Sequence, residues 1–114
     1  MNLERVNSEI KKELSVIIRD EVKDPRLESA IITITRVNVT ADLKHGKVWV
    51  SILSDETKSK IDALNTASNF MRATLFKRLK IRAVPELKFI IDDGAEYYVK
   101  IEKMLDELKM TSDE

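Results

Sequence analysis

Cysteine is absent from this 114-residue chain, and glycine and histidine are scarce. The lack of cysteine excludes disulfides, thiolate zinc sites and cysteine nucleophiles, and it fits a reducing compartment. Because Gly46 and Gly94 are the only glycines, no glycine-rich phosphate loop can form. The single histidine, His45, stands beside Gly46 in a predicted turn, where a solvated side chain is the usual outcome. These absences remove the commonest catalytic arrangements.

The chain also lacks any apolar run close to the roughly 18–20 residues that a membrane span needs. Its first residues are rich in charge and contain no apolar stretch typical of a secretory signal. Hydrophobic residues make up 43% of the chain, which is enough for one sizeable core. We therefore expect a cytoplasmic protein with one domain over residues 1–110 and a short, frayed acidic tail over 111–114.

Signals for catalysis or metal binding are weak. Asp92-Asp93 could be half of a metal site, but no second acidic cluster is recognisably matched to it. A strand end that runs into a helix N-terminus explains this pair more simply, because carboxylates favour the positive end of the helix dipole. The serines have no plausible histidine base. The sequence therefore predicts neither an enzyme nor a metal site.

Hydrophobic spacing predicts an α+β domain with one hairpin. Apolar residues at three- and four-residue steps predict a helix over 2–22, which Asp24-Pro25 ends. The same signals predict a long helical stretch that Ser54 or Asp55 caps and that reaches Leu79. Alternating β-branched and apolar residues predict three strands, at 31–41, 47–54 and 87–92. A last amphipathic pattern predicts a helix over 96–109.

Two irregularities interrupt these patterns. The alternation of the first strand slips between Ile34 and Val37, which a β-bulge or burial of both faces would explain. In the long helical stretch, the polar residues 65–69 have weak helix propensity. A straight helix with a weak middle, a kink and a helix–turn–helix are all compatible with this segment. Exposed amides at a break would suit phosphate contact.

Charge is balanced over the whole chain but unevenly distributed along it. Five cations and no anion lie between residues 72 and 82: Arg72, Lys77, Arg78, Lys80 and Arg82. Cations near a helix C-terminus are stabilised by the dipole, so part of the pattern is structural. A merely solvated face would usually mix the two signs. The block therefore favours a polyanionic partner, bound through phosphate neutralisation and counterion release.

Weaker candidates lie elsewhere in the chain. Lys23 and Arg26 flank Asp24-Pro25, where a helix stop with two solvated cations is the simpler interpretation. Trp49 and Phe70 could stack on bases, but both fit a core or a sheet face at least as well. We therefore assign the two aromatic residues structural roles.

With these residues placed, the chain resembles ribosome-binding factor A, a bacterial assembly factor of the small ribosomal subunit. The resemblance covers about residues 5–108 and rests on several motifs in order. These motifs are Glu13-Leu14 and Ile17-Ile18 leading into Lys23-Asp24-Pro25-Arg26, Thr33-Ile34-Thr35-Arg36-Val37, Asp42-Leu43, and Val48, Val50 and Ser51. The most specific stretch contains Arg72, Leu75 and the run from Arg78 to Phe89, and it closes on Asp92.

The resemblance implies a type II KH-like domain with the order α-β-β-α-α-β and a further C-terminal helix, in which helices pack on one face of a three-stranded sheet. KH domains grip nucleotide backbones with a GxxG loop, which this family replaces with an Ala-x-Gly kink. The matching triplet here is Ala67-Ser68-Asn69, with asparagine where the family usually has glycine. Asparagine tolerates the positive φ that glycine adopts, so the kink is expected to survive.

The resemblance also implies a non-enzymatic factor that binds the free small (30S) subunit and contacts its 16S ribosomal RNA. It implies assistance in late maturation and 5′-end processing of the precursor, with importance at low temperature. A monomer without cofactor, small-molecule substrate or membrane partner is expected.

The site that we expect is a basic face from the kink to the third strand. Its RNA contacts would be the five cations of the basic block, with Ser68 and Asn69 at the kink and with Lys23 and Arg26 in second rank. Replacing Arg78 and Lys80 by Glu is predicted to abolish subunit binding without lowering the unfolding midpoint. Two alternatives remain: a module whose basic face binds an acidic protein, and a small-ligand or catalytic α+β domain.

Overall fold

The computed structural model describes residues 2–92. Its elements, in chain order, are α1 (Leu3–Asp20), the 3-10 helix η1 (Pro25–Leu27), β1 (Ile31–Val39), β2 (His45–Leu53), α2 (Thr57–Thr66), α3 (Ser68–Arg78) and β3 (Glu86–Ile91). This order of helices and strands confirms the α-β-β-α-α-β arrangement of a type II KH-like domain. The predicted C-terminal helix at 96–109 and the tail at 111–114 lie outside the described residues.

The sheet has the strand order β1-β2-β3 and is mixed. β1 and β2 form the predicted antiparallel hairpin, whereas β3 lies parallel to β2 after the crossover through α2 and α3. The register of the hairpin shifts between Ile34 and Arg36, so the slip in the sequence pattern is a bulge. Because of this extra residue, Ile34 and Val37 are both buried on the same face of β1.

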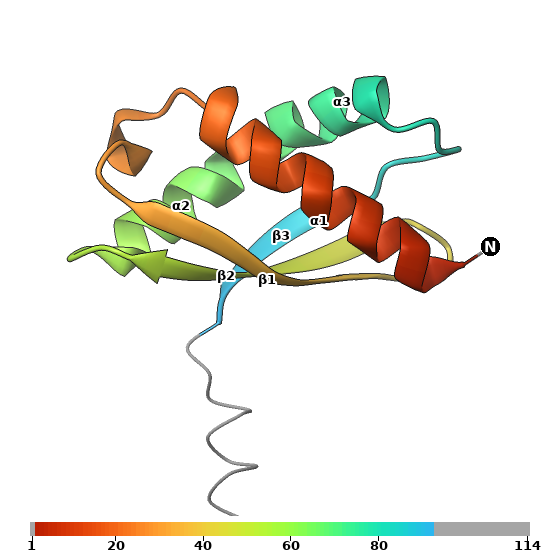
Figure 1. Ribbon diagram of the computed structural model, residues 1–114, viewed down its shortest axis with the longest axis horizontal. Helices are drawn as coiled ribbons and strands as arrows, with labels where there is room; N and C mark the ends of the chain where they lie inside the picture. The colour runs from red at the N-terminus through yellow and green to blue at the C-terminus, as the bar shows by residue number, and fades with distance from the viewer. Residues whose placement is uncertain (1, 93–114) are drawn as a thin grey trace, which may run out of the picture.

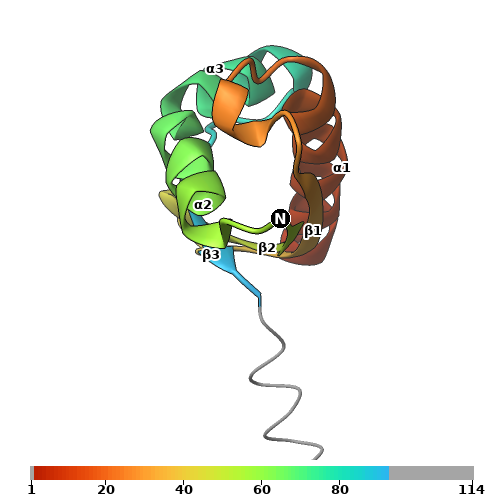
Figure 2. The same cartoon turned by 90° about the vertical axis from the view of Figure 1, so that its left-hand side faces the viewer.

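All helices that the structure describes lie on one face of the sheet (Figure 1). Seen from the side, α1, α2 and α3 arch over the strands, and the opposite face of the sheet has no helix from residues 2–92 against it (Figure 2). The core fills the space between the two layers. Its fully buried members come from both: Ile10, Leu14, Ile17, Val48, Val50, Leu64, Met71 and Leu75.

Asparagine side chains fasten both edges of the sheet to the helices. At the β1 edge, the Val39 N–H donates to Asn7 Oδ1 at 2.9 Å. At the β3 edge, the Phe89 N–H donates to Asn65 Oδ1 at 2.8 Å, and Asn65 Nδ2 donates to the Phe89 carbonyl at 3.0 Å. These bonds satisfy strand groups that would otherwise invite pairing with another chain. They also fix the position of α2 against β3.

Candidate nucleic-acid interface

The long helical stretch of the sequence is two helices, α2 and α3, which are divided at Ala67 (Figure 1). Ala67 has φ −85° and ψ 3°, yet its N–H still donates to the Ala63 carbonyl at 3.0 Å. Ser68 and Asn69 belong to the first turn of α3. Of the three interpretations left open for this segment, the straight helix is therefore wrong, and the chain breaks at Ala67. The expected use of a positive φ at Asn69 is wrong, because Ala67 makes the break and, within residues 2–92, Leu43 is the only non-glycine residue with positive φ.

The start of α2 also differs from the prediction. Neither Ser54 nor Asp55 caps the helix, because its N-cap is Glu56, which makes no side-chain cap hydrogen bond. The Ser54 hydroxyl oxygen instead accepts from the Glu56 N–H at 3.3 Å within the preceding turn.

The cations of α3 point to different sides of the helix. Arg72 is half-buried, and its Nε donates to the Val84 carbonyl at 2.9 Å. Arg78 reaches α1, where its guanidinium lies 2.9 Å from Glu21 and 3.4 Å from Glu13. The hydrogen bond to Glu21 is the main cause of a raised pKa at Arg78. The expectation of an uncompensated block is therefore wrong for Arg78, whose charge is matched by carboxylates from another element.

Three cations of the block are exposed and make no ion pair with any residue between 2 and 92: Lys77, Lys80 and Arg82. We call these three the α3–β3 cation cluster. Lys77 lies in the last turn of α3, and the other two lie in the loop that projects beyond this helix before β3 (Figure 1). Because no anion of the described residues is paired with it, the cluster can attract an external polyanion.

The loop that carries Lys80 and Arg82 is anchored at both ends. At its start, the Leu79 N–H donates to the Leu75 carbonyl at 2.8 Å. At its end, Val84 and Pro85 are buried, and Pro85 lies so close over Gly46 that a Cβ there would meet it at 3.3 Å. Arg72 thus has a positioning role, since its bond to Val84 holds the end of the loop against α3.

Two exposed aromatic rings lie on α3, the helix whose last turn carries Lys77 of the cation cluster. Phe70 is 50% exposed and Phe76 is 61% exposed. Both lie away from Met71 and Leu75, which face the core. The assignment of Phe70 to the core or a sheet face is therefore wrong. Phe76 was missed, although its position next to Leu75 on a helix of 3.6 residues per turn signals an outward ring.

A groove separates the N-terminal half of α1 from the loop that carries Lys80 and Arg82, which we call the basic loop. Its volume is about 600 Å³, and its lining includes Lys80 and Arg78 from one side and Arg5, Lys12 and Glu13 from the other. Arg5 is matched by Glu9, at 3.2 Å from Nε to the carboxylate. The groove therefore continues the surface of Lys80 toward α1, with Lys12 as a further exposed cation.

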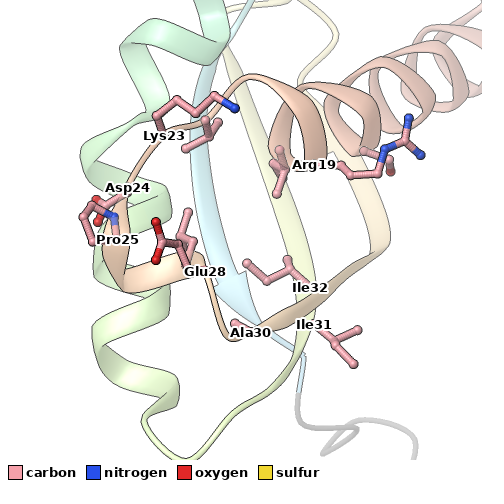
Figure 3. Close-up of a pocket in the computed structure, with 12 residues that line it drawn as sticks. Arg19, Lys23, Asp24, Pro25, Glu28, Ala30, Ile31 and Ile32 are labelled. Carbon is pink, nitrogen blue, oxygen red and sulfur yellow. The ribbon is translucent and has the colours of Figure 1, made fainter.

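Lys23 and Arg26 lie apart from this surface. They belong to the segment around η1, which contacts α2 and lies at the opposite end of the helical layer from the basic loop (Figure 1). Lys23 borders a hollow of about 710 Å³ between α1 and β1 (Figure 3). Arg26 is held by Asp24 at 2.8 Å, and this bond is the main cause of a lowered pKa at Asp24. The structure thus does not unite the second-rank candidates with the cation cluster.

Between residues 2 and 92, no three histidine or carboxylate side chains come close enough together to hold a metal ion. Over the same residues, no helix combines the length and the apolar character that crossing a membrane requires.

Comparison with known proteins gives one consistent result. The family model described as ribosome-binding factor A matches residues 2–105. A ribosome-binding factor A from Clostridium botulinum (strain Eklund 17B / Type B) is 44% identical over 108 residues, which cover 92% of both chains. One from Caldicellulosiruptor bescii is 41% identical and covers 97% of this chain and 86% of its own.

Solved structures agree with the sequence relatives. The crystal structure of ribosome-binding factor A from Thermus thermophilus superposes with a TM-score of 0.71 at 26% identity, covering 79% of this chain and 94% of that one. A homology model of the T. thermophilus factor, fitted into a cryo-EM map of a 30S complex with that factor, has a TM-score of 0.62 at 27% identity. It covers 74% of this chain and 88% of its own.

Proposed function

This chain belongs to the ribosome-binding factor A family, and from that premise we propose that it is a non-enzymatic assembly factor that binds the free 30S subunit through its 16S ribosomal RNA. The observation that carries the proposal is the α3–β3 cation cluster, whose members have no carboxylate partner among residues 2–92. Cations held on a helix end and on an anchored loop can neutralise phosphates, and the released counterions supply binding free energy.

The exposed rings of α3 add a second source of affinity. Phe76 immediately precedes Lys77 on α3 and Phe70 lies about two turns earlier, while Met71 and Leu75 of the same helix are packed in the core. Unpaired bases stack on aromatic side chains, and each such contact contributes about 1–3 kcal/mol. Asn69 is exposed next to Phe70, and with Ser68 it would supply polar contacts where α3 begins. An RNA with accessible bases next to its phosphates fits this surface.

The structure changes the weight of individual contacts within the proposal. Arg78 and Arg72 support the scaffold, so Lys77, Lys80 and Arg82 carry the phosphate contacts, with Lys23 and Arg26 outside the main surface. Three neutralised phosphates correspond to a slope of log K against log salt of about −2 to −3. The Arg78→Glu and Lys80→Glu double variant is unsuitable as a test, because a glutamate at 78 would face Glu13 and Glu21.

Sedimentation with small subunits tests the proposal. The test variant replaces Lys77, Lys80 and Arg82 by Gln, and the matched control replaces Lys11, Arg19 and Lys58, which are exposed on α1 and α2. Both variants lose two lysines and one arginine. At about 0.1 M salt we expect the test variant to bind about a hundredfold more weakly and the control to bind like the parent chain. Equal binding by both folded variants would remove the cation cluster from the mechanism.

An acidic protein partner would meet the same three cations, and nuclease treatment separates the two cases. If ribosomal RNA is the partner, digestion abolishes co-sedimentation with small subunits. If a protein is the partner, a nuclease-resistant complex remains after digestion, and the RNA proposal is wrong.

The proposal extends to the role of the factor in the cell. We propose that it works in the cytoplasm as a monomer, in late maturation of the subunit and in 5′-end processing of the precursor RNA, and that cells need it most at low temperature. Family membership supports this extension. A strain that lacks the gene should accumulate precursor with an unprocessed 5′ end in the cold, and the parent chain should restore processing better than the Lys77, Lys80 and Arg82 variant.

A further inference from the structure

The face of the sheet opposite the helices carries a second group of cations. No helix among residues 2–92 covers this face (Figures 1 and 2). Side chains alternate along each strand, so the residues between the buried positions of β1, β2 and β3 point toward it. We call it the open sheet face. Its centre is defined by Arg36, Lys47, Trp49, Lys88 and Ile90.

Two lysines stand side by side at this centre. Lys47 of β2 and Lys88 of β3 are register partners, and both are exposed. Neither makes an ion pair with any other residue between 2 and 92. Like charges on neighbouring strands destabilise a sheet. An anion bound between the two ammonium groups would relieve this repulsion.

The adjacent row of the sheet adds an aromatic ring and a guanidinium. Arg36, Trp49 and Ile90 are register partners across the three strands. The Arg36 guanidinium carbon lies 4.7 Å from the centre of the Trp49 ring, a cation–π contact that holds the two side chains together. Bases stack both on aromatic rings and on guanidinium planes, so the row offers a platform for one base.

Two carboxylates of the described residues, Glu86 and Asp92, flank this centre, and both have other contacts. Glu86 lies 3.7 Å from Nδ1 of His45. Asp92 accepts a hydrogen bond from the Thr35 hydroxyl at 2.7 Å. The ion pairs among residues 2–92 do not join Glu86 to Arg36, Lys47 or Lys88. Asp92 thus lies beside the Arg36–Trp49 row, but the three cations Arg36, Lys47 and Lys88 still outnumber the two flanking carboxylates.

We propose that the open sheet face binds a single-stranded segment of RNA, with a phosphate between Lys47 and Lys88 and a base on the Arg36–Trp49 pair. The two rows are two residues apart along the strands, or about 6.6 Å, which one nucleotide can span. A single strand is required because a duplex keeps its bases paired and stacked. The inference rests on the proposed function, to which it adds a second RNA contact on the side away from the α3–β3 cation cluster.

Trp49 is the only tryptophan of the chain and reports directly on this face. The probe is a single-stranded RNA dodecamer of mixed sequence, added to the full chain while Trp49 fluorescence is measured. We expect saturable quenching that persists in the Lys77, Lys80 and Arg82 variant. Replacing Lys47 and Lys88 by Gln should weaken binding about 25-fold at about 0.1 M salt and reduce the salt slope by about 1.4. Replacing Lys11 and Lys58 by Gln is the matched control.

Several outcomes would overturn the inference. Equal quenching by a duplex of the same sequence would exclude single-strand recognition, and equal quenching by polyglutamate would indicate an acidic protein partner. The inference would also be wrong if the Lys47 and Lys88 variant bound RNA with the affinity and salt slope of the parent chain. The proposed function would still hold in that case if the Lys77, Lys80 and Arg82 variant no longer sedimented with small subunits while the Lys47 and Lys88 variant did. If the parent chain binds neither the dodecamer nor small subunits, both proposals fail.

Discussion

Arg78 at the contact between α1 and α3 lies two residues before Lys80 of the following loop, but the two side chains differ in their partners. Only Arg78 is paired with carboxylates of the described residues. In the contact, Arg78 is held by Glu13 and Glu21, which lie 65 and 57 residues away in sequence. In the loop, Lys80 and Arg82 are exposed and have no ion pair with residues 2–92. A run of cations can therefore contain both scaffold residues and binding residues. The number of charges in a segment does not separate the two roles, because the partners come from elsewhere in the fold.

The largest expected contrast is between two consecutive residues of α3. Leu75 is fully buried, whereas Phe76 is 61% exposed. Replacing Leu75 by Ala should lower the free energy of unfolding by about 2–5 kcal/mol, because a cavity remains in the core. Replacing Phe76 by Ala should change it by less than about 0.5 kcal/mol but weaken RNA binding by about 1–3 kcal/mol through a lost stacking contact.

Urea unfolding and RNA titration of the two α3 variants measure the contrast. The Leu75 variant should bind RNA like the parent chain under conditions where it is folded. A Phe76 variant that loses as much stability as the Leu75 variant would show that this ring supports the fold, and the aromatic part of the proposed interface would be wrong.

Reversing the charge of Arg78 is expected to change stability less than the Leu75 substitution does, and comparing it with Lys80 separates the scaffold cation from the binding cation. Arg78→Glu would bring a third carboxylate to Glu13 and Glu21 and should lower the unfolding midpoint by several degrees. Lys80→Glu should leave the midpoint within error and should weaken subunit binding strongly. Adding Glu21→Arg to the Arg78→Glu variant should restore stability by exchanging the charges of the pair. Thermal melts without that rescue would contradict the role assigned to Arg78.

Patterns within one strand or helix were predictable from the sequence. The alternation of side chains located the slip after Ile34, because a strand has a period of two and one extra residue must shift it, and the register identifies the slip as a bulge. The weak helix propensity of residues 65–69 marked the segment in which α2 and α3 are divided, although it left a straight helix open as well. Both signals come from residues close together in the chain. They predict the folded structure because the buried face of an element fixes its register.

Contacts between elements were not predictable in the same way. Asn65 binds the edge of β3, but its sequence neighbourhood signals only weak helix propensity. Arg78 meets α1 because the two helices pack side by side, a fact that no spacing within α3 contains. The outward ring of Phe70 had a local signal, since Met71 and Leu75 define the buried side. That error came from giving hydrophobicity more weight than helical phase.

The smallest predicted effect concerns acid, which reaches carboxylates of the scaffold but leaves the lysines and arginines of the loop charged. The Arg26 guanidinium and backbone N–H both donate to Asp24 and lower its pKa. A carboxylate with a lowered pKa stabilises the fold above its ordinary pKa, and this contribution is lost as the pH falls through the lowered value.

Asp24→Asn keeps the oxygen that accepts from the Arg26 N–H but removes the charge. The variant should therefore be slightly less stable than the parent chain at pH 7 and should lose less stability between about pH 5 and pH 3. Urea midpoints across this range, with RNA affinity at pH 7 as a control that should not change, measure the difference. Identical acid profiles would mean that the Asp24–Arg26 pair contributes nothing to the fold and that the η1 segment depends on its apolar contacts.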